Sequence, residues 1–184
     1  GHVKHDGHNL TGFIIFLCSE SIIFFAFFVG YGVLKITAPT WYPDGVTGIA
    51  VREPLINTVI LVSSSFVIYF AERYLHKKNY WGFRIVWLIT MLMGSYFVYG
   101  QYVEWSELTF SLGSGVFGGL FYLLTGFHGL HVITGILLMG LMLYRSFIPG
   151  NYDKGEMGVE SISLFWHFVD VIWIILFILI YVWQ

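Results

Sequence analysis

Two histidines stand in the middle of a long stretch of this chain that contains no Asp, Glu, Lys or Arg. His128 and His131 lie within residues 112–144, in the segment FYLLTGFHGLHVITG. A helix rises ~1.5 Å per residue, so this stretch can cross a ~30 Å hydrocarbon layer. The i, i+3 spacing places both imidazoles on one helix face. Polar groups at that depth are costly unless they face protein or a cavity, so we predict that both point into a helix bundle.

Three more ionisable side chains fall inside apolar stretches. Glu20 lies in FLCSESIIFFAFF, and His167 and Asp170 lie in LFWHFVDVIW, again at i and i+3. Counted at ~1.5 Å per residue, all five groups lie roughly 15–25 Å from the membrane side that holds the N-terminus. A carboxylate there costs at least ~2.5–3.5 kcal/mol, so Glu20 is expected to be protonated or hydrogen-bonded to a neighbouring helix. We therefore predict a buried polar layer contributed by three helices.

This polar layer has three possible roles. The first is structural: the five groups bond to one another and hold the helices together. The second is a metal or haem site, because histidine and carboxylate sets bind both, although an i, i+3 pair on one helix is a loosely specific signal. The third is a proton relay, which would need a continuous polar path through the half of the membrane that lies beyond the layer.

The composition places the chain in a membrane. It is 57% hydrophobic, 20% aromatic and 11% charged, with a mean hydropathy of +0.75, whereas a soluble domain carries about a quarter charged residues. The net charge of −2 argues against a nucleic-acid partner. The single cysteine, Cys18, excludes an internal disulfide and a cysteine-based metal site. The first apolar stretch is too long for a signal peptide and lacks a cleavage site.

The apolar stretches predict an all-α fold, a polytopic bundle of five transmembrane helices. A polar tail, residues 1–9, carries His2, His5 and His8 and precedes a single transmembrane domain, residues 10–184. The predicted spans are 10–36, 55–71, 85–103, 113–145 and 160–183.

Smaller signals suggest how these helices pack and where the membrane ends. Asn57, Thr58 and the serines 63–65 soften the second span, which is typical of a helix–helix contact. Gly115 and Gly119 have the spacing that lets two helices approach closely. Trp41 and Tyr42, in the connection after the first span, are expected at the membrane surface.

Basic residues orient the bundle. With five spans, seven of the nine lysines and arginines fall on the side of the N-terminus: Lys4, Arg73, Lys77, Lys78, Arg84, Arg145 and Lys154. Lys35 and Arg52 fall on the other side. The positive-inside rule then predicts a cytoplasmic N-terminus and a C-terminus outside.

Several motifs, in this order, resemble subunit III of the haem–copper terminal oxidases, most closely that of cytochrome c oxidase. They are FLCSESIIFFAFF, EPLINTVILVSSS, YGQYVEW, FYLLTGFHGLHVITG and LFWHFVDVIW. Together they extend over essentially the whole chain. FHGLH followed about forty residues later by WHFVD is the most specific part. The resemblance implies a five-helix bacterial form that lacks the two N-terminal helices of seven-helix members, which form one wall of a lipid-filled cleft.

The resemblance also implies a role. Family members bind no haem or copper themselves. They pack against subunit I, which holds the redox centres and pumps protons while dioxygen is reduced to water in aerobic respiration; subunit II belongs to the same complex. Glu20 corresponds to the family's buried carboxylate. Arg145 corresponds to a basic residue that holds a phospholipid headgroup, as a guanidinium at a helix end can do.

The leading hypothesis is thus a non-catalytic subunit of a proton-translocating cytochrome c oxidase in a bacterial inner membrane, with a thylakoid or other energy-transducing membrane as the alternative. We expect no catalytic residue and no metal or cofactor bound by this chain. A quinol oxidase is the alternative within the family, although the residue before His128, Phe127, is that of the cytochrome c oxidases. A stand-alone membrane proton transporter is the rival from another class.

Overall fold

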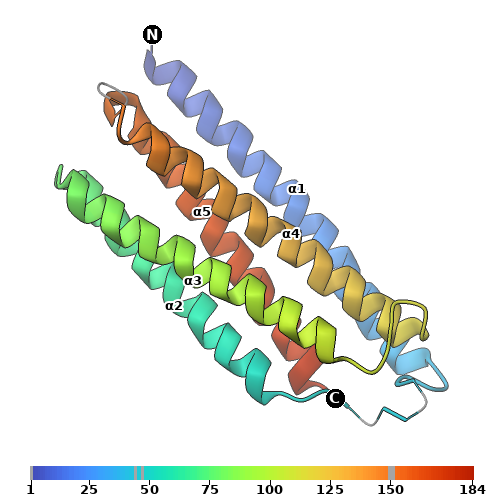
Figure 1. Ribbon diagram of the computed structural model, residues 1–184. Coiled ribbons are helices and arrows are strands. Elements are labelled where there is room, and N and C mark those ends of the chain that lie inside the picture. The colour runs from blue at the N-terminus through green and yellow to red at the C-terminus, as the bar shows by residue number, and fades with distance from the viewer. Residues whose placement is uncertain (1, 44, 47, 149–151) are drawn as a thin grey trace.

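The computed structural model describes residues 2–43, 45–46, 48–148 and 152–184, and within them the side chains of all but residues 2–10 and 152–157. Five helices run side by side: α1 (His2–Thr37), α2 (Arg52–His76), α3 (Tyr80–Glu107), α4 (Val116–Arg145) and α5 (Tyr152–Phe177) (Figure 1). A π-helical turn, η1 (Ile178–Val182), continues α5. Each helix contains a stretch that is long and apolar enough to cross a membrane. The predicted all-α bundle of five spans is confirmed.

The helix ends differ from the predicted spans because backbone hydrogen bonding continues past the apolar residues. The residues expected to form a polar tail continue α1 back to His2, while the side chains of His2, His5 and His8 lie outside the described part. Both α2 and α3 exceed the predicted ranges at each end. In contrast, α4 begins at Val116 rather than 113, because Gly115 has a φ of +133° that a helix cannot continue through.

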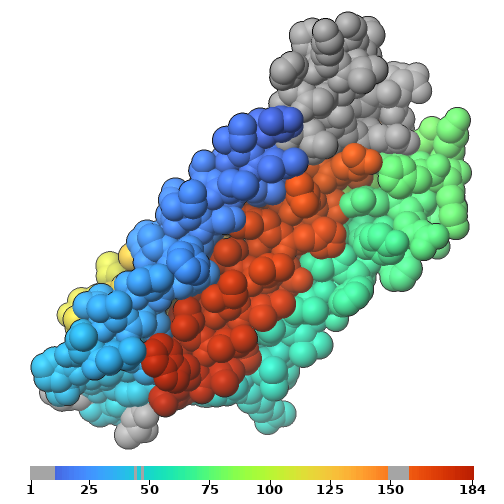
Figure 2. Space-filling view, turned by 180° about the vertical axis from the view of Figure 1, so that it is seen from behind, coloured from blue at the N-terminus to red at the C-terminus, as the bar shows by residue number. Residues whose placement is uncertain are grey.

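The central element is α5, which packs against α1, α2 and α4. Seen from behind, α5 lies between α1 and α2 (Figure 2). The most extensive pairing joins α2 and α3, while α1 packs mainly against α5 and α4. The two termini lie at opposite ends of the bundle (Figure 1), as five spans require. The bundle therefore has a well-packed side around α2, α3 and α5 and a more loosely attached helix, α1.

Small residues control the close helix contacts, but the glycines differ from those predicted. The contact on α2 is confirmed: Ser64 and Ser65 are both buried. The prediction for Gly115 and Gly119 is wrong, because a Cβ at Gly115 would meet nothing within 4 Å and one at Gly119 would meet a single backbone oxygen at 3.6 Å. Close approach occurs elsewhere. A Cβ at Gly100 would come within 2.0 Å of the Asn57 side chain.

Large aromatic side chains fill the remaining space between the helices. Trp87, Trp166 and Trp173 are fully buried. Trp41 and Tyr42, expected at the membrane surface, lie in the connection after α1 and pack edge-to-face against the Phe117 ring, with ring centroids 5.5 and 5.0 Å apart. The aromatic core thus extends to the end of the bundle where the C-terminus lies.

Candidate functional site

Glu20 and His131 form a hydrogen-bonded pair between α1 and α4. Glu20 Oε2 lies 2.8 Å from His131 Nε2. The other ring nitrogen, Nδ1, lies 2.8 Å from the carbonyl oxygen of Phe127 and must carry a hydrogen, since a carbonyl can only accept. The carboxyl and Nε2 therefore share one proton, as carboxylic acid and imidazole or as carboxylate and imidazolium. In either arrangement the pair carries no net charge, which meets the expectation for Glu20 of protonation or a bond to a neighbouring helix.

Aromatic rings surround this pair on both helices. The His131 ring lies 5.1 Å from that of Phe24 in α1, 4.7 Å from that of Phe127 in α4 and 6.2 Å from that of Phe165 in α5. The side chains of His131 and Glu20 are 13% and 18% exposed. The pair therefore lies near the surface of the bundle, in an apolar setting where each group depends on the other as its hydrogen-bond partner.

His128 joins α4 to α5 through the main chain. Its Nε2 donates to the carbonyl of Val169 at 2.9 Å, and the side chain is 1% exposed. The ring lies against Trp173 and Phe97, at centroid distances of 5.0 and 5.8 Å. Nδ1 is buried without a hydrogen-bond partner. With Nε2–H donating, His128 is a neutral imidazole that fixes the α4–α5 contact.

The last two members of the predicted layer do not join the first three in one network. His167 Nε2 lies 3.4 Å from the hydroxyl of Ser163 in its own helix, a weak contact. Asp170 is 6% exposed and lies beside Ser65 of α2, with Oδ1 lacking a partner of standard geometry. The five groups thus form four separate contacts: one between α1 and α4, one between α4 and α5, one within α5 and one between α5 and α2.

Tryptophan donors, which the sequence reasoning missed, supply further polar bonds between the helices. Two of them lie on α5: Trp166 Nε1 donates to the Ser64 hydroxyl and Trp173 Nε1 to the Thr58 hydroxyl, both at 2.8 Å. On α3, Trp87 Nε1 donates to the carbonyl of Met139 in α4 at 2.9 Å. The i, i+7 spacing of the α5 tryptophans, facing hydroxyl residues on α2, was a signal available in the sequence.

A second group of buried polar side chains lies toward the end of the bundle that holds the C-terminus. The Tyr181 hydroxyl in η1 donates to Glu104 Oε1 in α3. Glu104 Oε2, both amide atoms of Gln101 and the Tyr31 hydroxyl are buried without a standard partner. The sequence reasoning missed this group because it ended the third span at 103 and assigned Glu104 to a loop, whereas α3 continues to Glu107. The i, i+3 spacing of Gln101 and Glu104 was the available signal.

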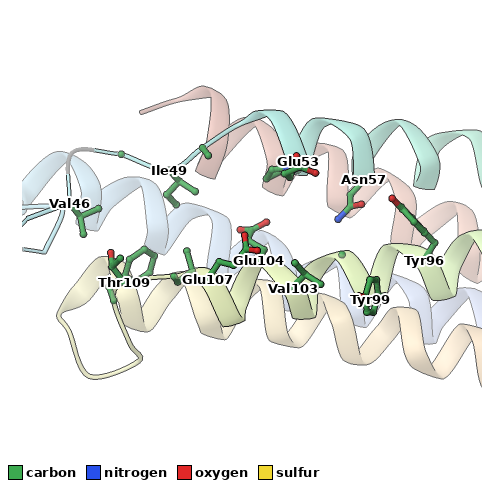
Figure 3. Close-up of a pocket in the computed structure, with 16 residues that line it drawn as sticks. Val46, Ile49, Glu53, Asn57, Tyr96, Tyr99, Val103, Glu104, Glu107 and Thr109 are labelled. Carbon is green, nitrogen blue, oxygen red and sulfur yellow. The ribbon is translucent and has the colours of Figure 1, made fainter.

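Glu104 of this second group borders a pocket of about 470 Å³ between α2, α3 and the connections at their ends, which we call the α2–α3 pocket. Figure 3 shows Asn57 from α2, and Tyr96 and Glu104 from α3, extending into the space between the two helices. Glu53 and Glu107 line it as well. A mostly apolar groove of about 400 Å³ lies on the other side of α3, between Val98, Leu130 and Ile133.

Two arginines lie at the opposite end of the bundle. Arg145 is the last residue of α4 and is exposed. Arg84 bonds to Ser146, from Nε to the hydroxyl at 3.1 Å and from a terminal nitrogen to the carbonyl at 2.6 Å. Its guanidinium also lies over the Trp81 and Phe147 rings, 4.8 and 4.4 Å from their centroids. Arg84 thus fixes the turn after α4, directly beside Arg145.

Neither polar group has the form of a redox or metal centre. Among the described residues, no three His, Cys, Asp or Glu side chains are placed to hold a metal ion. Two of the three intramembrane histidines bond to other helices through a carboxyl or a carbonyl. These polar groups join the helices to one another. They also place carboxyl groups at two sites, in the pair between Glu20 and His131 and in the pocket between α2 and α3.

Comparison with known proteins identifies the family. The family model described as "Cytochrome c oxidase subunit III" matches residues 2–184. Cytochrome c oxidase subunit 3 of Synechocystis sp. is 41% identical over 182 residues, which are 98% of this chain and 78% of that protein. The same subunit of Thermostichus vulcanus is 43% identical over 180 residues, 97% of this chain and 89% of that protein. The baboon (Papio hamadryas) subunit is 36% identical over 194 aligned positions, 97% of this chain and 74% of that protein. The chain therefore belongs to the cytochrome c oxidase subunit III family.

Proposed function

We propose that this chain is the supporting, non-redox subunit III of a proton-pumping cytochrome c oxidase. The observation that carries the proposal is the match over residues 2–184, which includes every member of the polar layer. The geometry supports it, because Glu20, His131 and His128 are used in bonds between helices. The chain's task is then to hold a rigid, lipid-facing bundle against the subunits that carry haem and copper.

The partners follow from the family. Subunit I is the direct neighbour, and subunit II belongs to the same complex. The excess of lysine and arginine on the side of the N-terminus supports a cytoplasmic N-terminus in a bacterial inner membrane or another energy-transducing membrane. Arg145, exposed at the end of α4, holds a phospholipid phosphate, since a guanidinium at a membrane surface can bond two phosphate oxygens at once.

Purification in mild detergent tests the proposal. The chain is expected to co-purify with a larger, haem-bearing subunit, and the complex is expected to show an oxidase spectrum and to oxidise cytochrome c. The chain purified alone should show neither activity nor proton flux after reconstitution. A chain that emerges alone and colourless, yet conducts protons, would instead be a transporter.

A further inference from the structure

The α2–α3 pocket has the properties of a ligand site that lies apart from the polar layer, and of its carboxyl groups Glu104 also takes part in a bond between helices. Among the described residues that line it, Glu53, Glu104 and Glu107 contribute carboxyl groups, and none is Lys, Arg or His. Its volume of about 470 Å³ is far more than one water molecule occupies, at ~30 Å³. The lining is therefore acidic and the space is large enough for a small organic group.

A buried amide provides an independent indication of a ligand. Asn57 is 5% exposed and lines the pocket, yet its side chain has no hydrogen bond to any described residue. Figure 3 shows that it extends from α2 into the space between α2 and α3. It lies so close to α3 that a Cβ at position 100 would meet the Asn57 amide nitrogen at 2.0 Å and force the amide to shift. Its amide atoms reach the pocket and have no partner among the described residues, so a group that enters the pocket can bond to them.

We propose that the α2–α3 pocket binds a primary ammonium group, carried either by a lipid headgroup or by a soluble amine. The pocket offers carboxylate and amide oxygens as acceptors, which suit a group with three N–H donors. Tyr96, which extends into the same space, adds an aromatic ring that attracts cations. A neutral hydroxyl-rich headgroup would leave the negative charge uncompensated, and an anionic headgroup that carries no ammonium group would be repelled. The inference stands apart from the proposed oxidase role, because it depends on this pocket alone.

Binding experiments with lipids and with soluble amines distinguish the two sources of the ammonium group. The purified, delipidated complex that contains this chain is incubated with phosphatidylethanolamine, phosphatidylcholine of the same acyl chains, or a neutral galactolipid, and retained lipid is measured by native mass spectrometry. A lipid site retains phosphatidylethanolamine in preference to the other two. In a parallel series, ethanolamine and spermidine bind directly if the source is a soluble amine, and phosphatidylethanolamine then shows no preference.

Variants assign the binding to the pocket. Glu104→Gln keeps the shape of the side chain and replaces an acid that can pair with the ammonium group by a neutral amide, and is expected to weaken binding of the retained amine roughly tenfold, as loss of a charge-assisted hydrogen bond does. Because Glu104 also accepts from Tyr181, a second variant combines Glu53→Gln with Glu107→Gln at two exposed positions and should weaken binding by a similar factor. The matched control is Glu160→Gln, an exposed carboxylate at the opposite end of the bundle, which should change nothing.

Two results would contradict the proposal. Equal retention of all three lipids, without binding of ethanolamine or spermidine, would show that the pocket does not select an ammonium group. So would amine binding that is unchanged in both pocket variants. If the Glu104→Gln complex does not assemble, the double variant of the exposed glutamates decides the question.

Discussion

The two sides of the bundle are held together by different means. In α1, only 17% of the most apolar stretch is buried inside the protein, against 50% in α5. A Cβ added at Gly30 of α1 would meet nothing within 4 Å, whereas one at Gly100 would meet Asn57 at 2.0 Å. The side built from α2, α3 and α5 therefore relies on close backbone approach and tryptophan donors. By contrast, α1 relies on the pair between Glu20 and His131 and on aromatic contacts. In a membrane, lipid is as apolar as the helix surface, so helices are held together by packing and hydrogen bonds. A single substitution should therefore act through packing on the side of α2, α3 and α5, and through the hydrogen-bonded pair at α1.

Gly100→Ala should destabilise the side built from α2, α3 and α5, by up to about 3 kcal/mol. The added methyl group collides with the Asn57 amide, and overpacking of this kind costs about 1–3 kcal/mol. The matched control, Gly30→Ala, places the same methyl group in open space on α1 and should leave the free energy of unfolding unchanged or raise it by up to ~1 kcal/mol. Stepwise denaturation of the purified chain in mixed micelles measures both. Equal effects of the two substitutions would mean that the two sides are packed alike.

Glu20→Ala tests the attachment of α1 directly. Removal of the carboxyl leaves His131 Nε2 without its partner and a void between α1 and α4, for an expected loss of about 2 kcal/mol. Glu20→Gln retains a donor and the shape, and should cost less than ~1 kcal/mol. Under the proposed supporting role, oxygen reduction and pumping should largely survive in the Gln variant. Complete loss of pumping in reconstituted vesicles would instead give this carboxyl a place on the proton path.

A double-mutant cycle of Trp166→Phe and Ser64→Ala measures one contact on the opposite side. The indole N–H donates to the hydroxyl at 2.8 Å, and polar bonds between membrane helices are worth on average about 0.6 kcal/mol, up to about 1.7. We expect a coupling energy in that range. A value of zero would show that shape complementarity alone holds α2 to α5 at this point.

Arg145→Ala is expected to change lipid content and not helix packing. The residue is exposed at the end of α4, so the free energy of unfolding should change by no more than ~0.5 kcal/mol. Phospholipid retained by the complex, measured by mass spectrometry after delipidation, should fall. The control is Tyr144→Ala, a neighbouring exposed position without charge. Unchanged lipid content in the Arg145 variant would exclude a headgroup at this site.

Alanine at His128, His131 or His167 should leave the metal content of the assembled complex unchanged. Each imidazole has contacts that belong to helix packing, and the described residues contain no set of three metal ligands. The measurement is haem and copper per assembled complex, by spectroscopy and elemental analysis. Stoichiometric loss of either group would make the histidine a ligand.

The apolar stretches were sufficient to predict five helices and their order, because each stretch must satisfy its backbone internally in lipid. They could not locate the helix ends, since a helix continues through polar residues once it leaves the hydrocarbon layer, as α3 does as far as Glu107. The partner of Glu20 was also beyond sequence reasoning, because the 2.8 Å bond to His131 joins residues 111 positions apart and depends on how α1 and α4 are turned. Spacing along one helix shows which side chains share a face, and it leaves open which helix that face meets.

The π-helical turn η1 has a consequence for how the end of the chain is aligned with its relatives. In this turn the N–H of Trp183 reaches back five residues, to the carbonyl of Ile178 at 2.9 Å. An α-helix turns roughly 100° per residue, so a π turn accommodates one extra residue while those beyond it keep their direction. The turn is therefore equivalent to the insertion of one residue into an α-helix. Gln184 now accepts from the N–H of Ile49 at 3.0 Å, and we expect a variant that lacks Leu179 to wind as a plain α-helix and keep this contact. An ungapped alignment across this segment would pair the wrong residues with those of a relative that is one residue shorter.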